Sequence, residues 1–317
     1  MAESHENDVS PKFIFPVGCV QGEDCWAVNY VDVDGDEGNH KDFKCGPKSY
    51  DHHKGTDFAL SSVVQMNEGI DVFAAAKGRV KRIRDGQSDH LKSAEEMKSL
   101  QESKKECGNG VLIDHGNGLQ SIYCHLKEGS IIVKPTQKVR AGEKIAQVGQ
   151  SGMAEFPHLH FGVMWEGGVI DPYTGMLNTQ GCGKSKDSMW HIGLPMNYQD
   201  VGIFDGGFRS KSPDFEAIKR GETNPEILPL KSAAFVFWVG FYNVEKGDKV
   251  TLRIIDPDGN IFVERHEELA KNRARQYYYT GRKIGRVQLK DGMYKGYVSI
   301  ERANKSIQDK VFSVLVR

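Results

Sequence analysis

The stretch EFPHLHFGV carries two histidines, His158 and His160, separated by a single leucine. Aromatic and β-branched residues surround the pair, which is typical of a β-strand, and residues two apart in a strand point to the same side. We therefore expect the two imidazole rings to converge on one spot. Such a pair is either structural, with both rings half-buried and hydrogen-bonded, or part of a metal site, and the rest of the chain decides between the two.

The stretch YDHHKGTDFAL supplies further metal-ligating side chains, because His53 lies four residues before Asp57, with Gly55 between them. Positions i and i+4 can meet one metal ion from a helix or from one face of an extended strand. A carboxylate beside imidazoles suits a borderline metal, and a catalytic zinc needs about three protein ligands and an open position for water. We predict a zinc site of His53, Asp57 and one histidine of HLH; on residue type alone, His52 is the alternative to His53.

A third motif, YCHL, places His125 at the end of another predicted strand. Alone, a histidine in that setting is more often structural. Together with the other two motifs, however, it brings the candidates to five, which is more than a closed structural zinc site requires. This surplus favours a catalytic site over a structural one.

The motifs HKGTD, YCHL and HLH occur in this order, with GNGVLIDHGNG just ahead of YCHL and VRAGEKIAQVG just ahead of HLH. In these motifs the stretch from Phe15 to Tyr173 resembles the lysostaphin-type zinc metallopeptidases, endopeptidases that cut the peptide cross-links of bacterial cell wall. The loop before HLH, SGMAEFP, departs from the family's usual Ser, Thr, Gly and Pro series, which bears on substrate preference.

The resemblance implies a role for each of the five candidates. It assigns His53, Asp57 and His160 as ligands of one zinc ion per chain, and His125 and His158 as the catalytic pair beside the water that the metal activates. One histidine of the pair acts as general base and the other donates a hydrogen bond to the oxyanion. The sequence allows either histidine to have either role.

Two other classes of function are compatible with parts of the sequence. Relatives that have lost ligands activate other wall enzymes, so a self-inhibited or non-catalytic wall-binding activator on the same fold is the alternative to an enzyme. VRAGEKIAQVG also resembles strands of lipoyl-type carrier domains, but no modification lysine sits in a matching turn. The complete set of five side chains favours the zinc endopeptidase.

Charge and hydropathy exclude several partners. The chain has 317 residues, with 42 Lys plus Arg against 43 Asp plus Glu, so nothing in its balance suggests nucleic acid as a partner. No run of eighteen apolar residues predicts a membrane span. The start MAESHENDVS lacks the features of a signal peptide, but it suits a mature N-terminus behind an added Met.

The cysteines predict an oxidising compartment. Their number is six, with no CxxC spacing, which favours disulfides over a metal knuckle, although six buried thiols in a cytosolic protein are the alternative. CGNGVLIDHGNGLQSIYC is expected to form a hairpin that turns at Gly116 to Gly118 and brings Cys107 close to Cys124. We therefore expect a periplasmic or secreted protein whose signal peptide has been removed.

Strand and turn signals predict a mainly β protein: an antiparallel-sheet lysostaphin-type metallopeptidase domain followed by an immunoglobulin-like β-sandwich. Residues 1–10 are predicted to be a flexible N-terminus, 11–195 the metallopeptidase domain and 196–317 the sandwich. A charged, helix-favouring insertion near 86–106 is either a solvated excursion or a lid over the site. The aromatic residues of the sandwich, Trp238, Tyr242 and the run at 277–279, are more often core than a stacking surface for sugar or peptide.

Overall fold

The computed structural model describes residues 11–194, 196–221, 224–285 and 289–317, so the predicted flexible N-terminus at 1–10 lies outside the described residues. The chain divides into two compact units. The boundary predicted between the metallopeptidase domain (11–195) and the sandwich (196–317) stays a prediction. Among the described residues, the first unit comprises those within 11–19, 29–59 and 68–197; the second comprises those within 20–28, 60–67 and 198–317.

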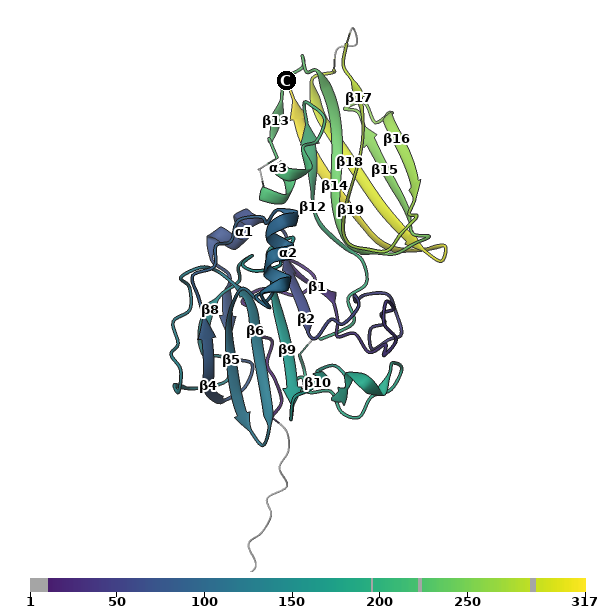
Figure 1. The fold of residues 1–317 in the computed structure, drawn as a ribbon. Coiled ribbons are helices and arrows are strands. Elements are labelled where there is room, and N and C mark those ends of the chain that lie inside the picture. Colours follow the sequence, from purple (N-terminus) through teal and green to yellow (C-terminus); the bar gives the residue numbers. More distant parts are fainter. Residues whose placement is uncertain (1–10, 195, 222–223, 286–288) are drawn as a thin grey trace, which may run out of the picture. The chain divides into compact units, whose positions relative to one another are not determined.

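The first unit is built on an antiparallel sheet in which β2, β9, β6, β5, β4 and β7 follow one another, with β10 on the far end of β9 and β11 beside it (Figure 1). A separate pair joins β3 and β8. The strands are β2 (Thr56–Leu60), β3 (Asp71–Phe73), β4 (Gly78–Arg84), β5 (Asn109–Gly116), β6 (Leu119–Leu126), β7 (Lys138–Val139), β8 (Lys144–Gln147), β9 (His158–Trp165), β10 (Gly168–Asp171) and β11 (Met176–Leu177). The strand β1 (Cys25–Asn29) is divided between the units, since only Asn29 belongs to the first.

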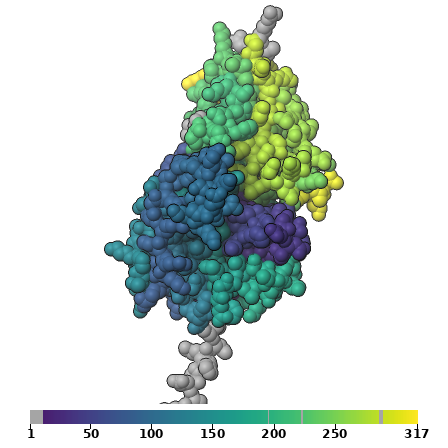
Figure 2. All heavy atoms as spheres, in the orientation of Figure 1, coloured from purple at the N-terminus to yellow at the C-terminus, as the bar shows by residue number. Residues whose placement is uncertain are grey.

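The β5–β6 hairpin is confirmed. Asn117 and Gly118 both have positive φ, 50° and 79°, as the tight turns that match strand twist require. Cys107 and Cys124 form the predicted disulfide. A second disulfide joins Cys45 to Cys182, 137 residues apart, and the segments on either side of it lie side by side on the surface of the unit (Figure 2).

All six cysteines are disulfide-bonded, and the described residues include no free thiol. The sequence analysis assigned only the Cys107–Cys124 pairing; Cys45 and Cys182 are 137 residues apart, and partners at that distance leave no local pattern. The bonded state supports the predicted oxidising compartment.

Helices are few and short: α1 (Val63–Glu68), α2 (Ala94–Glu102), α3 (Phe215–Arg220) and a 3₁₀ turn, η1 (Asn178–Gln180). The helix α2 lies in the charged insertion and begins at a capping box, in which Ser93 and Glu96 satisfy each other's backbone N–H groups. None of its side chains is buried. Within the described chain, no helix is long and apolar enough to cross a membrane.

The second unit contains two sheets, β12-β14-β17 and β13-β19-β18-β15-β16, antiparallel throughout except for the parallel pair β13 and β19. Both sheets contribute side chains to one apolar core, which makes the unit a β-sandwich; its immunoglobulin-like character stays a prediction. The strands are β12 (Gly202–Arg209), β13 (Ile227–Leu228), β14 (Ala234–Val244), β15 (Lys249–Ile255), β16 (Ile261–Glu268), β17 (Arg273–Lys283), β18 (Gly292–Arg302) and β19 (Lys305–Val316).

Most of the aromatic side chains of the sandwich belong to its interior. Trp238 and Tyr242 on β14 are completely buried, as expected for core residues, whereas Tyr279 on β17 is partly exposed. The second unit therefore does not offer Trp238 or Tyr242 as stacking surfaces.

Candidate metal centre

Three metal-ligating atoms meet where β2 and β9 lie side by side. Asp57 on β2 and His160 on β9 are directly opposite each other in the antiparallel register. The Oδ1 atom of Asp57 lies 3.1 Å from Nε2 of His53 and 3.0 Å from Nδ1 of His160, and these two nitrogens are 3.1 Å apart. The three atoms form a nearly equilateral triangle, in which the two imidazoles and the carboxylate can share one ion.

The dimensions of this triangle fit a zinc ion. Zinc bonds nitrogen and carboxylate oxygen at about 2.0–2.2 Å in a tetrahedron, whose ligand atoms are then about 3.3–3.6 Å apart. The Nδ1–H of His53 donates to the carbonyl oxygen of Tyr30 at 2.7 Å, so its Nε2 presents a lone pair to the triangle. Lone pairs gathered at this distance repel one another unless a proton or a cation lies between them.

Neighbouring groups hold the ligands in place. The side-chain N–H of Asn29 donates to Oδ2 of Asp57 at 2.9 Å, and the ring of Tyr50 stacks on His53 with centroids 4.3 Å apart. Gly55 makes room for His160, because a Cβ atom at this glycine would lie 2.6 Å from Nε2 of that ring. Such outer contacts orient metal ligands and tune their basicity.

The structure decides between the two adjacent histidines. His52 has a φ of 62°, and its backbone N–H donates to the buried carboxylate of Asp32 at 2.9 Å. Its side chain is 70% exposed and turned to solvent, whereas the His53 side chain is buried. The chain therefore brings His53, and not His52, to Asp57.

His125 and His158 form a second pair beside the ligands, with ring centroids 4.5 Å apart. Their Nδ1 atoms lie 2.8 Å from the carbonyl oxygens of Ser151 and Phe156, respectively. A carbonyl only accepts hydrogen bonds, so Nδ1 carries the proton in both rings and each neutral ring has a lone pair on Nε2. The Nε2 atom of His158 is 3.7 Å from Oδ1 of Asp57, at the edge of the ligand triangle.

The position of His125 depends on an unusual backbone conformation. Its φ is 60°, in the left-handed region that few residues other than glycine adopt, and its N–H donates to the carbonyl of Cys107 at 2.8 Å. The disulfide between Cys107 and Cys124 lies immediately beside it. Strained conformations of this kind persist only where the surroundings over-determine them.

The charged insertion supports the loop that holds His125. The carboxylate of Asp89 accepts hydrogen bonds from the backbone N–H groups of Gln150, at 2.7 Å, and Glu128, at 2.8 Å. Gln150 directly precedes Ser151, whose carbonyl orients His125. The beginning of the insertion thus stabilises the loop beside the site. The sequence analysis, which considered a solvated excursion or a lid, did not predict this role.

Burial and neighbouring charges shape the protonation of the cluster. Burial opposes ionisation of Asp57, but the three imidazoles of His53, His158 and His160, any of which attracts the carboxylate when it takes up a proton, outweigh burial and hold the pKa of this carboxyl well below its ordinary value. Burial, together with His158 and His160, lowers the pKa of His125 well below that of free histidine. At neutral pH His125 is therefore neutral and able to accept a proton.

The structure brings the five predicted side chains together, whereas sequence reasoning did not name the residues that contact them. Asn29, Tyr50, Asp89 and Ser151 carry no motif that separates them from ordinary strand or loop residues. The sequence analysis noted Gly55 only for its position between His53 and Asp57, whereas the structure shows that this glycine leaves space for His160.

Residues 51–172 match the family model described as peptidase family M23. The chain contains a peptidase family M23 domain. This confirms the resemblance to lysostaphin-type metallopeptidases that the three motifs carried, and the matched segment includes every one of the five candidate side chains.

The M23 domain resembles several curated proteins. "DD-carboxypeptidase/endopeptidase Mpg" of Neisseria meningitidis is 32% identical over 115 residues, which cover 36% of this chain and 24% of that protein. "Peptidoglycan DD-endopeptidase ShyA" of Vibrio cholerae is 32% identical over 119 residues, covering 38% and 22%. The chain thus spans less than a quarter of the length of either relative. Among solved structures, the catalytic domain of lysostaphin from Staphylococcus simulans is similar at 23% identity and a TM-score of 0.28, covering 38% of this chain and 77% of that one.

Proposed function

We propose that this protein is a zinc-dependent endopeptidase that hydrolyses the peptide cross-links of bacterial peptidoglycan, with one zinc ion held by His53, Asp57 and His160. The observation that carries the proposal is the triangle of ligand atoms 3.0–3.1 Å apart, flanked by two further histidines. Two relatives of the M23 domain are named as endopeptidases, one of them of peptidoglycan, which supports the choice of substrate.

In this proposal His125 and His158 carry out the proton transfers. When bound, zinc supplies a Lewis acid that polarises the scissile carbonyl and lowers the pKa of water. Each of the two histidines has its Nδ1–H bound by a backbone carbonyl, so only Nε2 is left to accept or donate a proton at the substrate. One takes the proton of the attacking water, and the other donates a hydrogen bond to the oxyanion; such positioned proton transfer contributes about 10²–10⁴ in rate.

The complete set of side chains distinguishes this proposal from the non-catalytic alternative. An activator that only binds the wall has no need for two histidines of defined tautomer beside three ligand atoms. The same geometry is compatible with a self-inhibited enzyme, and the experiment below identifies that case as bound zinc without cleavage of peptidoglycan.

We also propose that the protein works in the periplasm or outside the cell. Disulfides persist in oxidising compartments, and both the Cys45–Cys182 and Cys107–Cys124 bonds lie in the first unit, the second of them inside the M23 match. The substrate proposed here lies in the same compartment.

The test is to measure zinc in the purified protein and to digest isolated peptidoglycan with and without a chelator, analysing the released fragments. We expect about one zinc per chain and chelator-sensitive release of fragments freed by cleavage of cross-links. His160→Ala is expected to lose the metal, whereas His125→Ala and His158→Ala keep it and lose most of the activity. A stoichiometric zinc in His160→Ala would contradict the ligand assignment, and zinc without cleavage by the wild type would support the self-inhibited form instead.

A further inference from the structure

A pocket of about 670 Å³ opens in the first unit, at the end of β9 opposite to the metal centre. The proposed ligand His160 and Trp165 both lie on β9, so about five residues of extended strand, roughly 17 Å, separate the metal centre from the pocket. The pocket is within the range of about 300–1,000 Å³ that small-molecule sites occupy. None of the five side chains of the metal centre lines it.

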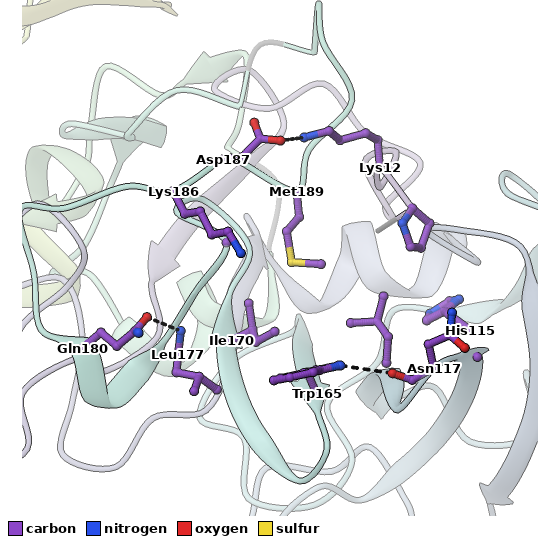
Figure 3. Close-up of a pocket in the computed structure, with 14 residues that line it drawn as sticks. Lys12, His115, Asn117, Trp165, Ile170, Leu177, Gln180, Lys186, Asp187 and Met189 are labelled. Atoms are coloured by element: carbon purple, nitrogen blue, oxygen red, sulfur yellow. Dashed lines mark hydrogen bonds and ion pairs between the residues drawn. The ribbon is translucent and has the colours of Figure 1, made fainter. Parts of the chain in front are cut away.

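Trp165 is the main feature of this pocket. Its indole is 44% exposed, although large aromatic rings are usually covered. The indole N–H donates to the carbonyl oxygen of Asn117 at 3.0 Å, which fixes the polar edge of the ring. In Figure 3 the ring is seen edge-on, with one face turned toward the space bordered by Met189 and Ile170. The pocket thus presents a rigid, flat apolar surface.

Polar groups surround this surface. Lys186 lines the pocket, and its ammonium group has no ion-pair or hydrogen-bond partner among the described residues. Gln180 uses its Oε1 to accept the N–H of Leu177 at 3.2 Å, which leaves its amide N–H groups available as donors. Lys12 forms an ion pair with Asp187 at 2.7 Å, and the two charges cancel. The charge of Lys186 is therefore left as a net positive charge on the pocket wall. The available groups are mostly donors, which suits a ligand rich in acceptor oxygens.

We propose that this pocket binds the saccharide chain of the wall polymer, with one N-acetylated sugar ring stacked on Trp165 and its oxygens bound by Lys186 and Gln180. A sugar ring has one flat face of C–H groups and a rim of oxygens, and both match an exposed indole bordered by donors. A peptide stem has no flat apolar face of this kind. The identity of the ligand rests on the proposed function, because the substrate there is peptidoglycan.

A site at this distance from the metal centre would hold the glycan while the attached peptide reaches the ligands at the other end of β9. Binding both parts of one polymer raises the effective concentration of the cross-link at the metal centre. The pocket therefore assigns a substrate-docking role to the first unit, which also holds the metal centre.

The experiment titrates the full chain with the tetrasaccharide of N-acetylglucosamine in the presence of a chelator, so that binding is measured without cleavage. Calorimetry gives the affinity and intrinsic tryptophan fluorescence reports the site. Of the four tryptophans in the chain, Trp26, Trp190 and Trp238 are buried and Trp165 is exposed, so a fluorescence change that Trp165→Ala removes is assigned to the pocket.

Saturable binding is expected, and Trp165→Ala should weaken it by about tenfold or more. Lys186→Ala, a change of an exposed side chain that leaves the fold intact, should weaken it by a smaller factor. Tyr279→Ala, which removes a comparably exposed aromatic ring from the second unit, serves as the matched control and should bind as the wild type does.

The absence of saturable binding, or equal binding by wild type and Trp165→Ala, would overturn the inference. So would binding of a sugar-free stem peptide that Trp165→Ala abolishes, because the pocket would then be a peptide site. Since the titration contains no metal and no cleavage step, a protein that binds the tetrasaccharide but does not digest peptidoglycan would refute the proposed function and leave this site standing.

Discussion

The Nδ1–H of His125 donates to the backbone carbonyl of Ser151 over 2.8 Å, so a loop 26 residues further along the chain orients one of the two proposed proton-transfer groups. That loop is in turn held by the carboxylate of Asp89, which accepts the N–H of Gln150. A local insertion in the sequence thereby takes part in the geometry of the metal centre.

Asp89→Ala should lower kcat by about 10- to 100-fold without removing zinc, because displacement of a catalytic group by about 1 Å costs that much. The measurement is peptidoglycan digestion together with zinc content. Glu102→Ala is the matched control, since Glu102 is an exposed acid of the same insertion and pairs with Lys98 on the same helix. Equal activity of Asp89→Ala and wild type would show that the loop keeps its position without this carboxylate.

Asn29→Ala should weaken zinc binding by about 10- to 100-fold, the usual effect of removing an outer contact to a metal ligand. The Asn29 side chain donates to Oδ2 of Asp57 and thereby directs Oδ1 toward the two histidine nitrogens. Competition with a chromophoric chelator gives the affinity. Asn39→Ala, which alters an exposed asparagine remote from the ligand contacts, should leave it unchanged; a wild-type affinity in Asn29→Ala would mean that Asp57 needs no orienting donor.

Gly55→Ala should displace His160 and remove most of the bound zinc. The added methyl group would lie 2.6 Å from Nε2 of His160 and 2.7 Å from the backbone oxygen of Phe161, both far inside van der Waals contact. Overpacking of this kind typically costs about 1–3 kcal/mol of unfolding free energy. Gly35→Ala meets nothing within 4 Å and is the control. Full zinc occupancy in Gly55→Ala, measured by metal analysis, would contradict the close approach.

Asp171 should make the M23 domain less stable as pH rises toward neutrality. Burial, reinforced by the carboxylate of Asp42, raises its pKa to about 7, although the N–H groups of Tyr173 and Thr174 oppose the shift. Between a pKa of about 3.8 in the unfolded chain and about 7 in the native state, the native state binds more protons. The free energy of unfolding therefore falls with increasing pH across this window, by up to about 4 kcal/mol.

Asp171→Asn should flatten this dependence between pH 5 and pH 8, measured by denaturant unfolding at a series of pH values. The substitution removes the ionisation but keeps the size of a side chain whose Oδ2 is buried without a hydrogen-bond partner in the described structure. Asp36→Asn, at an exposed position, should leave the pH profile of the wild type in place. An unchanged profile in Asp171→Asn would show that this carboxyl does not titrate in the window.

The sequence by itself determined the features that depend on residues close together in the chain. The alternation of strand residues places His158 and His160 on one face, since side chains repeat every two residues in an extended strand. The Asn117–Gly118 turn and the flanking cysteines specified the β5–β6 hairpin and its disulfide, because a short hairpin leaves few alternatives. The order of the three motifs was sufficient for the family.

Only the tertiary structure decided the features that join distant segments. It selected His53 over His52, because a single backbone turn sends the two adjacent side chains in opposite directions. It also supplied the contacts of Asn29 with Asp57 and of Asp89 with Gln150, and the disulfide between Cys45 and Cys182. Such contacts arise from strand register and loop packing. The contacts leave no periodic signal in the sequence, because neither partner differs in type or spacing from other strand or loop residues.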